Sequence, residues 1–338
     1  MRRPINIAVL GATGLVGLEF LRILEERSFP VGEVRALASA RSEGKKIPFK
    51  GGELTVHAVS RDAFKGMDFA LIAVGDDVSQ EWAPIAAEAG CIVVDKSNAF
   101  RMDPSVPLVV PEVNPEDTRG HQGIIAGPNC STIQMVMALA PLHRVNPITR
   151  VIADTYQSAS GAGLDAVEEL WEETRAVANG KDMQPSFLPY PLAMNLFPQI
   201  GGFSANGYCS EEIKLINETR KILHEPGMAI SATTVRVPVE ISHSEALHVE
   251  FTHAMSASEA RSILADSPGI AIIDEPFENQ YPMPLFAAGK DEVFVGRIRN
   301  DLSHPHGIAM WVVSDNLRKG AALNAVQVAE LMMEQDLL

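Results

Sequence analysis

The sequence lacks several features that would tie the protein to a special environment. It has only three cysteines, Cys91, Cys130 and Cys209, which are odd in number and far apart in a chain of 338 residues. A disulfide framework and a CxxC metal site are therefore excluded, and a reducing cytoplasm is the expected location. No apolar stretch approaches the length of a membrane span, and no repeat or low-complexity segment is visible.

Positive charge is also scarce. The chain carries 28 Lys and Arg against 43 Asp and Glu, a formal net charge of -15. This balance argues against nucleic-acid and membrane partners, although a local cationic pocket for phosphate remains compatible with it. The hydrophobic content of 46% is that of an ordinary globular protein, and the length favours two domains.

The first segment predicts a dinucleotide site. An apolar strand at 5–10 runs into the glycine turn Gly11-Ala12-Thr13-Gly14-Leu15-Val16-Gly17, and a helical pattern follows. Glycines let the backbone approach a pyrophosphate, and the helix start supplies N–H groups and a positive dipole. A tight turn that needs glycine only for its geometry is the alternative. Met1-Arg2-Arg3 and the apolar run resemble a signal peptide, but Glu19 and Arg22 argue against one.

The next turns favour NADP. After a strand at 34–38, the chain has Ser39, Arg41 and Ser42 where NAD-selective enzymes usually carry an acid, a set that suits a 2′-phosphate. A solvated basic loop is the alternative. The turn at Gly75 follows a strand at 69–74 and lies where the cofactor would lie. With a helix between 82 and 87 and a strand at 92–94, this alternation predicts a Rossmann-like, mostly parallel sheet.

The stretch from Gly123 to Leu142 predicts a nucleophile. A short strand ends at Ala126, Gly127-Pro128-Asn129 breaks it, and Cys130 opens a run with helical spacing. A helix start lowers a thiol pKa and offers donors to a developing oxyanion. An inert buried cysteine is the alternative.

The second half predicts an α+β domain with a largely antiparallel sheet, with strands at 150–156, 233–239, 247–252, 293–298 and 308–313. Glu211 and Lys214 share one face of a helix whose N-cap we expect at Ser210. An ordinary surface pair explains their spacing equally well. Arg236 lies on a strand, and His243 follows it; a lone His in such a place is usually structural.

Taken in order, these motifs resemble the bacterial type of aspartate-semialdehyde dehydrogenase. The resemblance runs from end to end and rests on eight motifs in the family's order: GATGLVG, ASARSEGK, SNAFR, GPNCST, QSASGAG, EEIK, RVPVEISHSEA and SDNLRKGAALNA. Each motif alone is only moderately specific, whereas eight in this order are very specific.

The resemblance implies reversible, NADPH-dependent reductive dephosphorylation of L-aspartyl 4-phosphate to L-aspartate 4-semialdehyde, in lysine (diaminopimelate), threonine, methionine and isoleucine biosynthesis. It implies Cys130 as the nucleophile that forms a thioester, His243 as the acid/base catalyst and Gln157 as the residue that orients the acyl group. Arg236 would bind the substrate carboxylate and Glu211 its ammonium. Lys214, Arg101 and Asn129 would form the phosphate site.

The cofactor site expected from the glycine-rich turns and the chain's last segment comprises Gly11, Thr13, Gly14, Leu15, Val16, Ser39, Arg41, Ser42, Gly75, Ser160, Gly161 and Asn316. We expect an NADP-binding domain at 1–130 and 315–338, a catalytic and dimerisation domain at 131–314, no metal, and a homodimer.

Three alternatives stay open. N-acetyl-glutamyl-phosphate reductase runs the same chemistry, but its neutral substrate amine would leave Glu211 without a purpose, and its cysteine motif differs. A glyceraldehyde-phosphate dehydrogenase is less favoured, since its cysteine neighbourhood also differs. A catalytically silent paralogue with a binding role is disfavoured by the intact set of Cys130, Gln157, Arg236 and His243.

Overall fold

The computed structural model describes residues 3–338 and divides them into two compact units. Of the described residues, the first unit contains 3–129 and 321–338, and the second contains 130–320. The boundaries expected from the sequence lay at 130/131 and 314/315. Cys130 and the segment 315–320, which were expected in the NADP-binding domain, thus belong to the second unit. Among the described residues, no helix is both long and apolar enough to cross a membrane.

The first unit is built on a seven-stranded sheet in the order β3-β4-β2-β1-β5-β6-β7, parallel except for the β3–β4 hairpin. The prediction of a Rossmann-like sheet is confirmed. The hairpin was not predicted. The elements are β1 (Ile5–Leu10), α1 (Leu15–Glu26), β2 (Val31–Ala38), β3 (Lys46–Phe49), β4 (Gly52–Ala58), β5 (Phe69–Ile72), α2 (Asp76–Glu88), β6 (Ile92–Asp95), β7 (Ile124–Ala126) and α8 (Leu323–Glu334).

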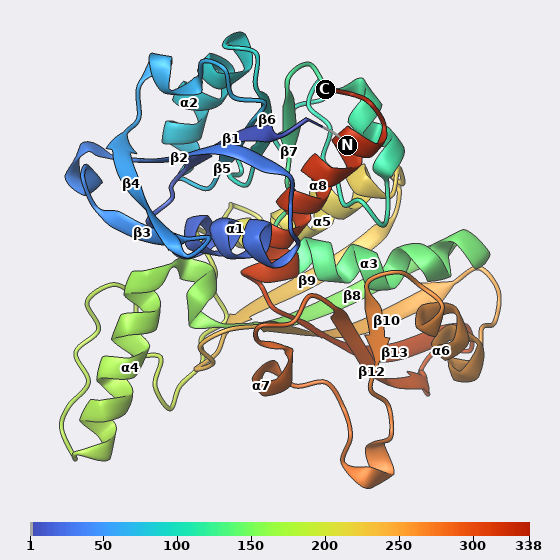
Figure 1. The fold of residues 1–338 in the computed structure, drawn as a ribbon. Coiled ribbons are helices and arrows are strands. Elements are labelled where there is room, and N and C mark those ends of the chain that lie inside the picture. Colours follow the sequence, from blue (N-terminus) through green and yellow to red (C-terminus); the bar gives the residue numbers. More distant parts are fainter. Residues whose placement is uncertain (1–2) are drawn as a thin grey trace. The chain divides into compact units, whose positions relative to one another are not determined.

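The side chains of β1 point alternately to the two faces of the sheet and contribute to an apolar cluster on each face. Ile5, Ile7 and Val9 face one side of the sheet and pack in a cluster with α1 and α8. Ala8 and Leu10 face the other side and pack with α2. Figure 1 shows α1 and α2 on opposite faces of this sheet. The terminal helix therefore returns to the first unit, as the sequence analysis anticipated.

The second unit is built on a six-stranded sheet in the order β11-β12-β13-β10-β8-β9. The three central pairings are antiparallel, and the two outer ones are parallel. This confirms the prediction of a largely antiparallel sheet. The elements are α3 (Cys130–Val145), β8 (Ile148–Gln157), α4 (Leu164–Ala178), α5 (Ser210–Ile222), β9 (Ala229–Arg236), β10 (His243–Phe251), α6 (Ala257–Ala265), β11 (Ile270–Ile272), α7 (Pro284–Ala287), β12 (Val293–Asn300) and β13 (Gly307–Ser314).

One long excursion of the second unit is held by carboxylates. After α4 the chain runs without a helix or strand until α5. Glu169 accepts hydrogen bonds from the main-chain N–H groups of Ser186, Phe187 and Leu188. Glu173 accepts hydrogen bonds from the main-chain N–H groups of Leu192 and Ala193. These bonds satisfy main-chain N–H groups of the segment and hold it in an ordered conformation.

Candidate active site

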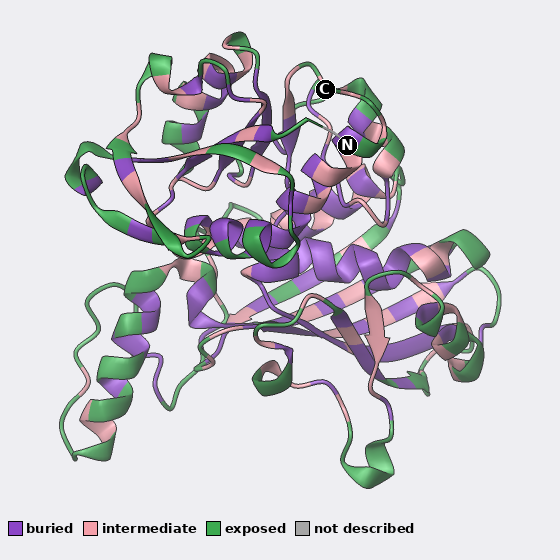
Figure 2. Ribbon diagram, viewed as in Figure 1, coloured by how far each residue is buried: buried purple, intermediate pink, exposed green. Residues whose placement is uncertain are grey.

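Cys130 is the first residue of α3 and is half-buried, whereas the helix from Ser131 to Ala140 is buried throughout (Figure 2). The helix packs against β8, β10, β13 and α5. A Cβ on Gly320 would lie 3.0 Å from the Cβ of Cys130, so a larger residue where the chain passes Cys130 would crowd it. The predicted helix start at Cys130 is confirmed.

Strand register gathers the other candidates at one edge of the six-stranded sheet. Gln157 and Arg236 are direct partners at the ends of the parallel strands β8 and β9. His243 begins the neighbouring strand β10, whose next residue pairs with Tyr156, and His243 itself pairs with Ser314 at the end of β13. Three residues that are far apart in the sequence therefore lie together.

The side chains of Arg236 and His243 are both buried and lie close together. The Arg236 guanidinium donates a 2.5 Å hydrogen bond to the main-chain oxygen of Ser158. A Cβ on Gly161 would lie 3.0 Å from both the Arg236 guanidinium and His243 Nε2. Burial lowers the pKa of Arg236, and the negative charges of Glu211 and Cys130 oppose that shift. The guanidinium thus lies within electrostatic range of both.

His243 is uncharged in this environment. Burial, together with the positive charge of Arg236, lowers its pKa to about 3. The role of acid/base catalyst that the resemblance implies favours a pKa near neutrality, whereas the folded protein moves the pKa of His243 well below that range. Sequence spacing could not reveal this, because complete burial and the nearby guanidinium arise only in the folded chain.

Glu211 lies in the first turn of α5 and is buried, and Lys214 donates a 3.2 Å hydrogen bond to it. The predicted pairing on one helix face is confirmed. The N-cap is Cys209 rather than Ser210, and Glu212 closes a capping box by accepting from the Cys209 N–H at 2.8 Å. Glu212 also accepts from Thr234 N–H on β9, which fixes the helix start beside the strand that carries Arg236.

Gln157 reaches the cysteine helix directly. Its Nε2 donates to Ser131 Oγ at 2.7 Å and lies 3.3 Å from Thr155 Oγ1. Ser131 follows Cys130, so the Gln157 amide is anchored one residue from the thiol. Asn316 accepts from Ser158 Oγ, which lies 3.1 Å from His243 Nδ1, and donates to Ser160 Oγ. The second unit thus brings together Cys130, Gln157, Glu211, Lys214, Arg236, His243, Ser160, Gly161 and Asn316.

In the first unit, the glycine turn has the geometry expected for a phosphate cradle. Gly11 has φ of 90°, and a Cβ there would lie 2.2 Å from Ala73 O; a Cβ on Gly17 would lie 2.1 Å from Gly11 O. Helix α1 begins after Gly14 with neither a side-chain cap nor an acid in its first turn. The N–H groups around Thr13, Leu15 and Val16 thus start a helix that suits an anion.

The end of β2 carries the predicted hydroxyl and arginine set. Ser39 and Arg41 are exposed, Ser42 is buried, and the Ser42 N–H donates to Ser39 O in a short turn. No acidic residue stands between Ala38 and Ser42. Gly75 is also exposed, at the start of α2 after β5, as the sequence analysis placed it.

Arg101 and Asn129 are both buried in the first unit. Arg101 donates to the main-chain oxygens of Gly127 and Lys96 at 3.0 and 2.8 Å. Lys96, which the sequence analysis did not select, donates to Pro128 O at 2.7 Å. Two cations therefore hold the loop that leads into Cys130. Lys96 could have been found from its place directly after β6.

Comparison with known proteins first defines the class. The semialdehyde dehydrogenase NAD-binding domain matches residues 6–121, and the semialdehyde dehydrogenase dimerisation domain matches residues 139–319. The chain is thus a two-domain semialdehyde dehydrogenase, an oxidoreductase with a nicotinamide-dinucleotide-binding domain.

Curated relatives narrow the class. Aspartate-semialdehyde dehydrogenase of Aquifex aeolicus is 52% identical over 98% of this chain and 99% of its own, and that of Synechocystis is 50% identical over 99% of both. Among solved structures, aspartate semialdehyde dehydrogenase II from Vibrio cholerae, complexed with ASA, has a TM-score of 0.96 and 45% identity, covering 98% of this chain and 99% of that one. The chain belongs to the aspartate-semialdehyde dehydrogenase family.

Glu245 is a buried acid that no candidate role uses. It lies two residues after His243, is fully buried, and neither carboxylate oxygen has a hydrogen-bond partner among the described residues. Burial raises its pKa well above the usual range, and Gln134 on α3 opposes this only in part. The folded protein therefore holds a neutral carboxylic acid beneath the cysteine helix.

This acid gives a pH-dependent prediction for Glu245→Gln. The pKa of Glu245 is higher in the folded protein than in the unfolded chain. Its neutral form therefore contributes fully to the free energy of unfolding below the unfolded-state pKa, and this contribution decreases as the pH rises above that value. We expect the variant to match the wild type near pH 4 and to be increasingly more stable at higher pH, by at most about 1.4 kcal/mol per pH unit. Urea unfolding across this range measures the difference; a pH-independent difference would contradict the neutral acid.

Proposed function

We propose that the chain catalyses reversible reductive dephosphorylation of L-aspartyl 4-phosphate to L-aspartate 4-semialdehyde, with NADPH as the reductant and Cys130 as the covalent nucleophile. The proposal rests on one observation: the second unit contains a cysteine at a helix start together with buried Arg236 and Glu211, which carry opposite charges. A small zwitterionic acyl substrate needs one cation, one anion and one nucleophile.

The first unit fits a dinucleotide. The close approaches at Gly11 and Gly17 leave no room for a Cβ, and the uncapped start of α1 offers N–H groups to a pyrophosphate. We infer NADP rather than NAD because Arg41, Ser39 and Ser42 follow β2 without an acid. A related structure, aspartate semialdehyde dehydrogenase from Candida albicans at 27% identity, TM-score 0.76 and 99% and 100% coverage, was solved with NADP. The bound cofactor would supply the hydride that reduces the acyl carbonyl.

Cys130 is assigned the covalent step. Its thiolate would attack the acyl carbonyl carbon, the carbonyl oxygen would take the negative charge, and phosphate would leave with the bonding electron pair to give a thioester. The positive end of α3 favours both the thiolate and that oxygen anion. Gln157, anchored on Ser131, is placed to orient the acyl group. His243 is assigned the hydrogen-bonding and proton-handling role at the reacting oxygen.

The charged ends of the substrate are assigned to the second unit. Arg236 offers a planar fork to the α-carboxylate, and Glu211 offers a carboxylate to the ammonium. Lys214, which pairs with Glu211 in the absence of ligand, is assigned to phosphate. The resemblance adds Arg101 and Asn129 of the first unit to the phosphate ligands, and Ser160, Gly161 and Asn316 of the second unit to the cofactor site.

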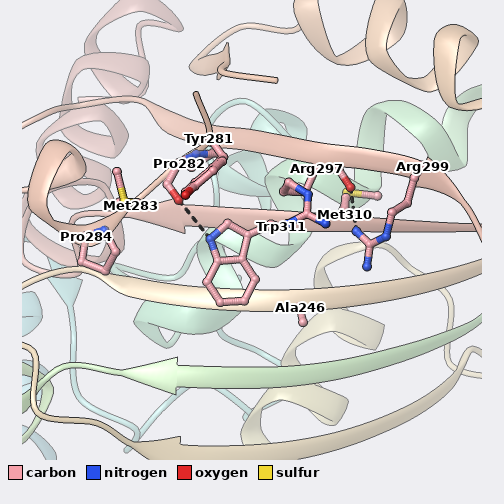
Figure 3. Close-up of a pocket in the computed structure, with 9 residues that line it drawn as sticks. All are labelled: Ala246, Tyr281, Pro282, Met283, Pro284, Arg297, Arg299, Met310 and Trp311. Carbon is pink, nitrogen blue, oxygen red and sulfur yellow. Dashed lines mark hydrogen bonds between the residues drawn. The ribbon is translucent and has the colours of Figure 1, made fainter. Parts of the chain in front are cut away.

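We propose that the chain acts as a homodimer through the face of the six-stranded sheet opposite α3. A pocket of about 310 Å³ lies there, and its lining includes Met283, Met310 and Trp311. Figure 3 shows Trp311 Nε1 directed at the main-chain oxygen of Pro282, to which it donates a 3.1 Å hydrogen bond. Tyr156 packs 5.4 Å from Trp311 and is partly exposed. A second copy would cover this apolar surface. Three cysteines without a disulfide are consistent with the proposed cytoplasmic location.

The decisive assay compares two aldehydes. With phosphate and NADP, aspartate semialdehyde should give NADPH absorbance, and N-acetylglutamate semialdehyde should not, because its neutral nitrogen cannot pair with Glu211. Cys130→Ser should abolish the reaction while leaving NADP binding and the melting temperature nearly unchanged. A serine variant that keeps more than about a tenth of the wild-type rate would rule out covalent catalysis by Cys130.

Coenzyme choice should depend on Arg41. In Arg41→Ala, KM for NADP should rise at least about ten-fold, because a charged hydrogen bond to the 2′-phosphate is lost, whereas KM for NAD should hardly change. Arg119→Ala removes an exposed arginine at the other edge of the sheet and is the matched control. Equal changes in KM for NADP and NAD would contradict the assignment of Arg41 to the 2′-phosphate.

Glu211 should decide recognition of the free amine. Glu211→Gln should raise KM for aspartate semialdehyde about ten-fold or more and leave KM for phosphate nearly unchanged, since only the amino acid brings a cation. Lys214→Ala should do the reverse. Glu218→Gln removes a charge two turns further along α5 and serves as the control. If Glu211 and Lys214 form only a structural ion pair, both variants will resemble this control.

A further inference from the structure

The side chain of Glu212 joins the start of α5 to the strand β9. Its Oε2 accepts the Cys209 N–H at 2.8 Å, and its Oε1 accepts the Thr234 N–H at 3.0 Å. Glu212 is buried, so both bonds are shielded from water. Each carboxylate oxygen therefore has its own main-chain donor, one at the helix start and one on the strand.

The position of β9 at the outer edge of its sheet makes this contact possible. β9 is the last strand in the six-stranded order, next to β8. Thr234 and Arg236 are two residues apart, so their main-chain N–H groups point to the same side of the strand. On that side the Arg236 N–H donates to Phe197 O at 2.9 Å, and the Thr234 N–H donates to Glu212. The carboxylate thus satisfies an edge donor that a further strand would otherwise bind.

A second contact connects the same two elements. Cys209 is the N-cap of α5, and its Sγ lies 3.2 Å from Thr234 Oγ1. Both of these side chains are fully buried. The contacts among Cys209, Glu212 and Thr234 form the α5–β9 clamp, which holds the helix start to one residue of the strand through both its main chain and its side chain.

The neighbours of the α5–β9 clamp carry opposite charges. Glu211 directly precedes Glu212, and Arg236 lies two residues beyond Thr234 on the same buried face of β9. The negative charge of Glu211 opposes the lowering of the Arg236 pKa by burial, so the two groups interact. Because the clamp joins the residues next to them, it fixes how far apart the carboxylate and the guanidinium lie.

We propose that Glu212 is the positioning residue that sets the separation between Glu211 and Arg236, and thereby adapts the site to an α-amino acid. The inference rests on the proposed function, in which these two side chains bind the ammonium and the carboxylate of the substrate. Those two groups share one carbon atom, so a small displacement of α5 prevents both contacts from forming together. Lys214, one turn along α5, moves with Glu211, and the phosphate contact assigned to it depends on the same clamp.

Steady-state kinetics of Glu212→Gln test the proposal. An amide has one acceptor oxygen and an NH2 group that donates, so one of the two main-chain N–H groups loses its partner. We expect KM to rise at least about ten-fold for both aspartate semialdehyde and phosphate, while KM for NADP stays near the wild-type value. Glu211→Gln and Lys214→Ala should each affect only one of these ligands. A rise in neither KM, or in only one, would overturn the positioning role.

Glu212→Asp separates the position of the carboxylate from its charge, and it carries the test if Glu212→Gln does not fold. Aspartate keeps the negative charge, but its side chain is shorter by one methylene group and cannot reach both N–H groups. We expect the same double rise in KM. Wild-type KM values in Glu212→Asp would mean that only the negative charge matters, which overturns the proposal.

The α5–β9 clamp is also measured without turnover, through the buried thiol of Cys209. Alkylation by iodoacetamide, followed by mass spectrometry of the labelled peptides, gives a rate for each cysteine. In Glu212→Gln the rate at Cys209 should rise at least about ten-fold, because the helix start opens more often, whereas the rate at Cys91, a buried thiol of the first unit, should not change.

Unchanged labelling of Cys209 in Glu212→Gln would overturn the clamp as the cause of any kinetic change. A wild-type protein that does not turn over aspartate semialdehyde would contradict the proposed function, and the labelling rates would still decide whether Glu212 holds the helix start.

Glu169→Gln is the matched control. Glu169 is also buried, and both of its carboxylate oxygens accept main-chain N–H groups, but these belong to the segment after α4. The control should lose thermal stability and keep wild-type KM values for aspartate semialdehyde and phosphate. If Glu212→Gln likewise lowers only the melting temperature, Glu212 serves the fold alone, which would overturn the proposal.

Discussion

The register between β8 and its two neighbours is the constraint on which the second unit depends. Pairing Gln157 with Arg236 puts an amide and a guanidinium side by side at one sheet edge, and the β10 register adds His243 to them. A shift of one residue in either pairing would send the affected side chains to the opposite face. The main-chain hydrogen bonds between these strands thus position the proposed catalytic side chains, although they involve none of the reacting atoms.

Short sequence patterns were sufficient to predict several of the elements that build the two units. The glycine turn at Gly11, the helix start at Cys130 and the apolar strand at 5–10 each depend on neighbouring residues, and each was predicted. The β3–β4 hairpin was missed because its strands are short and largely exposed, so no apolar period marks them. The N-cap shifted from Ser210 to Cys209 because the thiol and Glu212 together close a capping box.

The interior of the site could not be predicted in this way. The contact of Ser158 with His243 spans 85 positions, and that with Asn316 spans 158. No pattern within a short window encodes such distances. The family resemblance supplied residue identities, but the neutral state of His243 and the neutral acid at Glu245 follow from burial, which only the folded chain determines.

The return of α8 to the first unit has a consequence for how the chain folds during synthesis. Residues of α8 from Leu323 to Met333 share one apolar cluster with Ile5, Ile7 and Val9. That cluster cannot close while the ribosome still holds the last helix, whereas every strand of the second unit precedes α8. Although domains usually fold in N-to-C order, the first unit therefore lacks its last helix until the strands of the second unit have been synthesised.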